Sequence, residues 1–446
     1  MKYLKLLILL FVAPLFSGAQ TPELNTHTLA NGVKVYFLKY GKIDAMHISV
    51  MVGSGKKNEA PGQQGYNSMV ATLLLKGNTR FKMEEQNDRL FAIGADVDVE
   101  AGYDYTGLSA NVLSKDADEV LTLLSAAIKE PLFEKEMVDQ HLSILRNYNQ
   151  ADKMDIGQIA SIYSGYVIHG KESPFGRHLN KNQLKATTVE KIKEFHQFNF
   201  IPKNTHIVVC GNFKNKDVLG LIEKHFGNWQ STYNSLNSVS FDQPRIKKRE
   251  LYFANRTAAT QTALQWNFKA PSIKDKDYLS FVIANQIFNQ ILFKEIREKG
   301  GKTYNISSMP LNTQNTDLLI VRSSVRSEEV NNTIALFDKT LNDFNNGGFT
   351  QEEFTNEITR FKTHLMAIEF PDEIIEFYNP VIYDFKKREK LLKDVEKIKM
   401  EDVKKVIQRY FVPESYKLVI AGDEKILQTQ LAGIKGLKKL GVKDLE

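Results

Sequence analysis

The chain has 446 residues, of which 42% are hydrophobic and 25% are charged, a composition typical of a globular protein with about two to four domains. The formal net charge of +6 comes from lysines and arginines spread along the sequence. Because nucleic-acid binding requires a clustered basic stripe or a recognition motif, these features predict no nucleic-acid partner.

Residues 1–19 have the pattern of a secretory signal peptide. Two lysines precede an apolar run from Leu6 to Phe16, and residues 17–19 are small. This pattern predicts cleavage before Gln20 and export to the periplasm or the cell exterior. No later segment approaches the ~20 apolar residues of a membrane span, so no span is expected.

The segment that follows alternates between strand-like and helix-like patterns. An Asn31-Gly32 pair within an alternating run predicts a hairpin. Strands are expected at residues 28–37, 47–52, 96–102 and 104–112, and helices at residues 64–76, 84–93, 117–128 and 134–150. At the other end of the chain, lysines 435, 438, 439 and 443 among apolar residues predict a solvated terminal helix.

Residues 190–211 and 401–422 repeat one design, an amphipathic helix, a proline and an apolar strand that ends in glycine. The offset is constant, because 401 − 190 and 422 − 211 both equal 211. The residues that recur at this offset are Glu190, Gln197, Pro202 and Gly211, as Glu401, Gln408, Pro413 and Gly422. We infer two similar halves of roughly 210 residues each.

The joint between the halves is expected between Trp229 and Lys248, a stretch rich in Ser, Asn and Gln. The predicted organisation is therefore a first half at 20–233, a linker at 234–248 and a second half at 249–446. The single cysteine, Cys210, excludes an intramolecular disulfide, and its apolar strand predicts a small buried side chain.

The segment 65–78 reads Gly-Tyr-Asn-Ser-Met-Val-Ala-Thr-Leu-Leu-Leu-Lys-Gly-Asn and resembles the zinc helix of insulinase/pitrilysin metallopeptidases. In that family Gly-x-x-His-x-x-Glu-His supplies two zinc ligands and a general base. Those slots hold Ser68, Ala71 and Thr72 here, which share one helix face. Alanine has no donor atom and neutral hydroxyls are poor zinc ligands. We therefore expect a retained helix, no metal and no catalytic residue of the chain's own.

Other segments extend the resemblance along the chain: Ser173–Arg177, Val209–Phe213 and Phe226–Trp229. The resemblance implies an α+β fold of two homologous halves, each a mostly antiparallel sheet backed by helices, which face each other around a chamber. The family's third zinc ligand is a Glu whose slot falls here near Asn147 or Tyr148, so this ligand is also missing.

Residues 293–308 resemble a second family signature, Arg-Glu-Lys-x-Gly-x-x-Tyr, and place Arg297 and Tyr304 in its Arg and Tyr positions. The resemblance implies that both hold substrate backbone and stabilise an oxyanion at the zinc site. A guanidinium and a phenol are suitable donors for that role, but neither is a nucleophile or a base. The alternative is a surface arginine paired with Glu295 or Glu298 and an ordinary strand tyrosine. The segment just before this signature, Asn285–Leu292, differs from the corresponding segment of the family, which is rich in glycine.

Competing site classes lack their signatures. The run Gly53–Lys57 is Gly-rich and basic but lacks P-loop spacing, and no Gly-x-Ser-x-Gly elbow is present. Ser68 has no base evident in the sequence. The nine histidines include no pair three or four residues apart, so no local helical metal clamp is predicted.

Three functional hypotheses remain. The leading hypothesis is a non-catalytic subunit. It supplies Arg297 and Tyr304 for peptide hydrolysis at the zinc site of a partner chain that carries the HxxEH motif. The second is a peptide-binding or scaffold protein of the same fold with no role in proteolysis. The third is an active enzyme with unrecognised metal ligands.

Overall fold

The computed structural model describes residues 23–148, 154–234, 244, 246–301, 303–314, 316–367 and 388–441. The predicted signal peptide and most of the predicted linker lie outside these residues, and both stay predictions. Among the described residues, no helix combines the length and apolar character that a membrane crossing requires.

The first half contains a six-stranded sheet in the order β1-β2-β6-β3-β5-β4. Its strands are β1 (Glu23–Thr28), β2 (Lys34–Lys39), β3 (Ala45–Val52), β4 (Val97–Ala101), β5 (Thr106–Leu113) and β6 (Thr205–Gly211). Only the β2–β6 pair is parallel. The predicted hairpin is confirmed: β1 and β2 are antiparallel, Gly32 has a φ of 95° and Asn31 Oδ1 accepts from the Val33 amide.

A second six-stranded sheet has the order β12-β7-β11-β8-β10-β9. Its strands are β7 (Glu250–Asn255), β8 (Gln261–Lys269), β9 (Thr303–Asn312), β10 (Asp317–Arg326), β11 (Lys417–Gly422) and β12 (Lys438–Leu440). Strands β7, β11, β8, β10 and β9 take the places that β2, β6, β3, β5 and β4 take in the first sheet. The expected α+β fold with two mostly antiparallel sheets is confirmed.

The predicted C-terminal helix is wrong. Residues 438–440 form the edge strand β12, which pairs in parallel with β7. The edge of β7 offers free backbone groups, and the lysines stay near solvent beside acidic partners. Lys438 Nζ lies 2.6 Å from Glu250 Oε1, and Lys439 forms an ion pair with Glu424.

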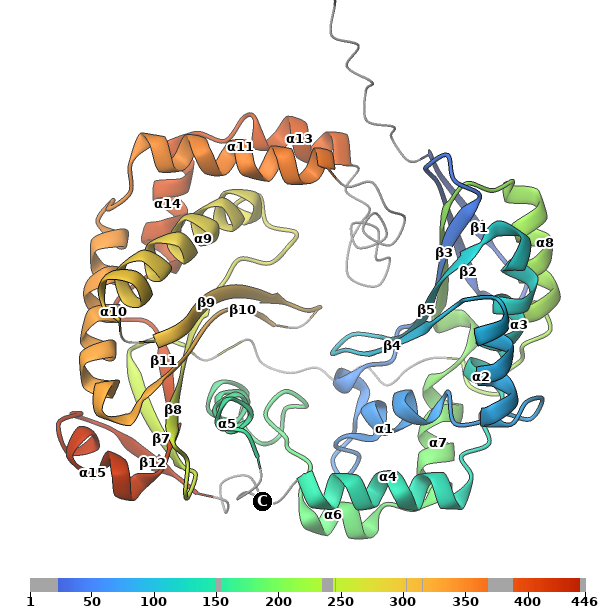
Figure 1. Ribbon diagram of the computed structural model, residues 1–446, viewed down its shortest axis with the longest axis horizontal. Coiled ribbons are helices and arrows are strands. Elements are labelled where there is room, and N and C mark those ends of the chain that lie inside the picture. Colours follow the sequence, from blue (N-terminus) through green and yellow to red (C-terminus); the bar gives the residue numbers. More distant parts are fainter. Residues whose placement is uncertain are drawn as a thin grey trace, which may run out of the picture.

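Helices cover the outer faces of both sheets (Figure 1). The helices of the first half are α1 (Tyr66–Leu73), α2 (Met83–Ala92), α3 (Ala117–Lys129), α4 (Lys135–Tyr148), α5 (Ile156–His169), α6 (Lys181–Ala186), α7 (Val189–Asn199) and α8 (Asn215–Phe226). In the second half they are α9 (Tyr278–Leu292), the π-helical η4 (Phe293–Lys299), α10 (Val330–Asn345), α11 (Gln351–Ala367), α13 (Arg388–Val395), α14 (Met400–Tyr410) and α15 (Glu424–Ala432). Helices α7 and α14 match at both ends with the offset of 211, since 400 − 189 and 410 − 199 give that value.

The inner faces of the sheets are partly covered by helices from the opposite half. Helix α5 lies on the second sheet, where Ile159, Ala160 and Tyr163 pack against apolar residues of β7, β8 and β11. Conversely, Leu365 of α11 packs on the first sheet in one cluster with Cys210. Figure 1 shows α5 beside β8 and α11 with α13 extending toward the first half. Cys210 is fully buried, as predicted.

Candidate functional site

Helix α1 is held in place by its own apolar face and by one buried carboxyl. Gly65 begins the helix with a φ of 85°, a left-handed conformation that glycine adopts without strain. Met69 and Val70 lie in the core of the first half. Glu59 Oε1 accepts a hydrogen bond of 3.0 Å from the Asn67 amide in the first turn. The expected helix is therefore present, and apolar packing and the Glu59 hydrogen bond hold it in place.

The three zinc-motif slots on α1 offer almost nothing that could bind a cation. Ser68 and Thr72 are exposed, and Ala71 is buried. Thr72 Oγ1 already donates to the Ser68 carbonyl oxygen at 3.0 Å. On α4, Asn147 in the third-ligand slot is exposed and carries an amide. This donor set does not fit zinc, which prefers imidazole, thiolate and carboxylate ligands.

Among the residues that the structure describes, no cluster of three or more His, Cys, Asp or Glu side chains could hold a metal ion. Tyr148 contributes backbone to the end of α4, and its side chain is outside the description.

Arg297 lies on η4, where Ile296 is buried and anchors the turn to the second core. The Arg297 side chain is exposed, and its guanidinium carbon lies 4.6 Å from the centre of the Phe293 ring. The alternative pairing with Glu295 is not seen, because Lys299 Nζ occupies that carboxylate at 2.7 Å. Among the described residues, no ion pair joins Arg297 to Glu295 or Glu298, and its guanidinium lies over the Phe293 ring.

The chain turns from η4 into β9 through the two predicted glycines. Gly300 caps the turn and Gly301 has a φ of 60°. Tyr304 belongs to β9 by its backbone, and its side chain lies outside the described atoms. The pairing of Arg297 and Tyr304 in one site therefore stays a prediction.

The segment Asn285–Leu292, which lacks the glycines of the corresponding family segment, has a structural role. Asn285 and Asn289 on α9 bind Ser308 of β9: Ser308 Oγ donates to Asn285 Oδ1 at 2.7 Å, and Asn289 Oδ1 accepts from the Ser308 amide at 3.0 Å. Asn285 and Ser308 are both buried. These bonds fix β9 against α9 and so fix the strand that carries Tyr304.

Sequence reasoning missed a pocket of about 460 Å³ next to Ser68. Its charged lining groups are Lys56, Glu59 and Arg177. Burial raises the pKa of Glu59 to about 7, against the opposing effect of its hydrogen bonds and of the two cations. Burial lowers the pKa of Lys56. The residues are far apart in sequence, and the only signal was the basic glycine-rich run that fails as a P-loop.

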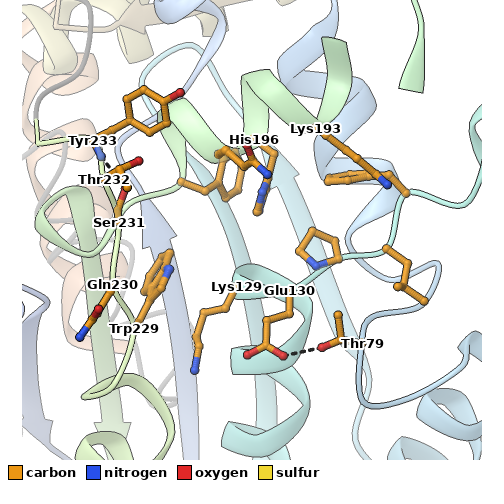
Figure 2. Close-up of a pocket in the computed structure, with 15 residues that line it drawn as sticks. Thr79, Lys129, Glu130, Lys193, His196, Trp229, Gln230, Ser231, Thr232 and Tyr233 are labelled. Carbon is orange, nitrogen blue, oxygen red and sulfur yellow. Dashed lines mark hydrogen bonds between the residues drawn. The ribbon is translucent and has the colours of Figure 1, made fainter. Parts of the chain in front are cut away.

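Another pocket, of about 620 Å³, lies between the ends of α3 and α7 and the segment Trp229–Tyr233 (Figure 2). Two of its charged groups, Lys129 and Glu130, are occupied within the protein. Lys129 Nζ donates to the His225 carbonyl oxygen at 2.8 Å, and the Glu130 carboxylate accepts from Thr79. We place the candidate site at α1, because the segment that resembles the family's zinc helix lies there.

Comparison with known proteins agrees with the motifs. The family model "Insulinase (Peptidase family M16)" matches residues 38–162, and the model "Peptidase M16 inactive domain" matches residues 186–361. An uncharacterized zinc protease of Bacillus subtilis, YmxG, is 19% identical over 354 residues, which is 76% of this chain and 83% of that protein.

Two solved structures share the fold. A protease from Helicobacter pylori superposes with a TM-score of 0.81 at 18% identity and covers 90% of this chain and 100% of its own. The periplasmic protease PqqL from Escherichia coli superposes with a TM-score of 0.72 at 15% identity over 96% of this chain but only 50% of its own. The two family models together match residues 38–162 and 186–361 and describe one family. The chain belongs to the insulinase family, peptidase family M16.

Proposed function

We propose that this chain is a non-catalytic subunit of a two-chain insulinase-like zinc peptidase. Its partner carries HxxEH and the zinc, and the two chains together hold a peptide substrate. The observation that carries the proposal is the asymmetry between the two signatures. The slots Ser68, Ala71 and Thr72 have no group that suits zinc or general-base chemistry, whereas Arg297 is retained and exposed.

Arg297 and Tyr304 would contribute donors to the partner's reaction. Negative charge develops on the carbonyl oxygen when a peptide is hydrolysed, and fixed donors stabilise it. The guanidinium of Arg297 keeps its charge at neutral pH and is not occupied by an adjacent carboxylate. It lies on a π-helical turn, a feature frequently found at functional sites.

The fold comparison supports the need for a second unit. This chain matches PqqL over 96% of its own length but only half of that protein. The other half of the PqqL chain is therefore long enough to form a second unit of the same size. In the proposed complex, that second unit is supplied by a separate chain.

The proposal includes export and the two-half organisation. Residues 1–19 serve as a signal peptide, and the halves 20–233 and 249–446 are joined by the linker 234–248. The mature chain works in the periplasm or outside the cell.

The direct test is co-expression with an HxxEH protein encoded beside this chain, followed by co-purification and a fluorogenic peptide assay. We expect a stable complex that hydrolyses peptide, and no hydrolysis by this chain alone. A lone stable chain that binds peptide, beside an HxxEH protein that is fully active without it, would instead establish the scaffold hypothesis.

A further inference from the structure

The pocket beside Ser68 combines two cations with a fixed aromatic wall. Lys56 Nζ lies 5.5 Å from the centre of the Tyr103 ring. That ring stacks on Phe175 with 4.7 Å between ring centres and an angle of 19°. The stacking fixes the position of the ring, so the ammonium group has a rigid surface on one side and the pocket on the other.

Arg177 is bound to backbone oxygens and not to a carboxylate. Its exposed fraction is 8%, its Nη1 donates to the Glu172 carbonyl oxygen at 3.1 Å, and its Nη2 donates to the Glu59 carbonyl oxygen. Its Nε is buried without a hydrogen-bond partner among the described atoms. Buried donors normally have partners, and the Arg177 side chain lines the pocket, so its guanidinium places positive charge there without a carboxylate partner.

The pocket has two basic side chains and one acid, so Glu59 can offset only part of the positive charge. Within the described part of the chain, neither Lys56 nor Arg177 forms an ion pair. Glu59 is the single carboxyl in the pocket lining. One of its oxygens binds the α1 backbone, and its raised pKa, about 7, leaves it partly protonated at neutral pH. The first turn of α1 adds a further favourable field for an anion.

We propose that the pocket formed by Lys56, Arg177, Tyr103 and Ser68 binds a carboxylate group of a peptide. The carboxylate would supply the acceptor that Arg177 lacks and the counter-ion that Lys56 lacks. The group belongs either to the peptide's C-terminus or to an acidic side chain. That the ligand is a peptide rests on the proposed function, whereas the carboxylate site itself rests on the arrangement of Lys56, Arg177 and Tyr103 in the pocket.

Isothermal titration calorimetry with the mature chain, without any partner, tests the proposal. The probes are an N-acetylated alanine pentapeptide with a free C-terminus, the same peptide with a C-terminal amide, and the amide with one central glutamate. At least one carboxylate-bearing probe is expected to bind about tenfold more tightly than the plain amide. Binding of the free acid identifies a C-terminal site, and binding of the glutamate peptide identifies a side-chain site.

Two pairs of variants connect that binding to the pocket. Lys56→Gln is expected to weaken carboxylate binding about tenfold, and Lys181→Gln, which removes the charge of an exposed lysine nearby on α6, to leave it unchanged. Ser68→Asp places a negative charge at the exposed edge of the pocket and is expected to weaken binding, whereas the neutral Ser68→Asn is not. Ser68 is exposed, so neither substitution disturbs the core.

The proposal is overturned if the plain amide binds as tightly as both acids, or if Lys56→Gln and Ser68→Asp leave carboxylate affinity unchanged. These results are independent of the HxxEH partner. If the chain binds carboxylates but forms no active complex, the proposed subunit role is contradicted and the pocket assignment is still supported.

Discussion

The Asn267 amide on β8 donates a hydrogen bond of 3.1 Å to Ser164 Oγ on α5, and both side chains are almost completely buried. This bond joins a helix of the first half to the sheet of the second. Asn267 also donates to the Lys417 carbonyl oxygen at 3.1 Å. Because these groups have no access to water, their contact ties the two halves together as part of the fold.

A double-mutant cycle tests that connection. Asn267→Ala is expected to lower the free energy of unfolding by about 1 to 3 kcal/mol, because it leaves buried acceptors unpaired. Ser164→Ala should cost less, because Asn267 keeps its other acceptors. Urea unfolding of the double variant should show a coupling of at least about 0.5 kcal/mol. Strictly additive losses would mean that α5 does not dock on β8 in solution.

Four histidines predict a loss of stability in acid. Burial lowers the pKa of His169, His178, His196 and His206 to about 4. The unfolded chain therefore binds more protons between pH 6.5 and 4. Each histidine lowers the free energy of unfolding by about 1.4 kcal/mol per pH unit in that window. Melting temperatures from pH 8 to 4 check this slope.

A single variant separates this effect from general acid denaturation. His196 Nε2 lies 2.9 Å from the Ile128 carbonyl oxygen, and glutamine can replace that contact without titrating. His196→Gln should have a shallower acid slope than the parent. An unchanged slope would show that His196 is not buried in its neutral form.

Glu59 predicts a slope of the opposite sign. Its folded pKa of about 7 is above the unfolded value of 4.5, so its protonation stabilises the fold below pH 4.5 and this contribution is lost as the pH rises through 7. Glu59→Gln should therefore gain stability relative to the parent between pH 4.5 and 7.5, by roughly 3 kcal/mol at most. A difference that does not vary with pH would place the Glu59 carboxyl in water.

Gly211 explains one of the repeated positions in physical terms. Its φ is 148°, and a Cβ atom there would lie 2.4 Å from the Ala45 carbonyl oxygen. Gly211→Ala is expected to cost about 2 kcal/mol or more in thermal unfolding. Gly220 is the matched control, because it is exposed within α8 and a Cβ atom there meets nothing within 4 Å. Gly220→Ala should stabilise the chain by about 0.5 to 1 kcal/mol, and equal effects would contradict this account.

The sequence contained enough information for the elements and the duplication. Helical periodicity located α1 and α3, and the offset of 211 anticipated the matching bounds of α7 and α14. Features that depend on tertiary contacts could not be predicted from the sequence. Local pattern could not distinguish the three-residue β12 from a helix, because its pairing with β7 is a tertiary contact.

The candidate site was only half predictable for the same reason. The loss of zinc ligands at Ser68, Ala71 and Thr72 could be predicted from the sequence, since it depends only on which residues stand in the segment that resembles the family motif. The cationic pocket is not, because Lys56 and Arg177 are 121 positions apart and meet only in the folded first half. Likewise, nothing in the periodicity of α5 indicates that it packs on the opposite half's sheet.

The central claim is that this chain supplies substrate-binding and oxyanion-stabilising donors to a catalytic partner. The most direct measurement is kcat/KM for a fluorogenic peptide with the reconstituted two-chain complex, comparing Arg297→Ala with Arg326→Ala, an exposed arginine of the same half. We predict a loss of about 100-fold for Arg297→Ala, with complex formation intact, and no change for the control. Equal activity of the parent and Arg297→Ala complexes would contradict the account.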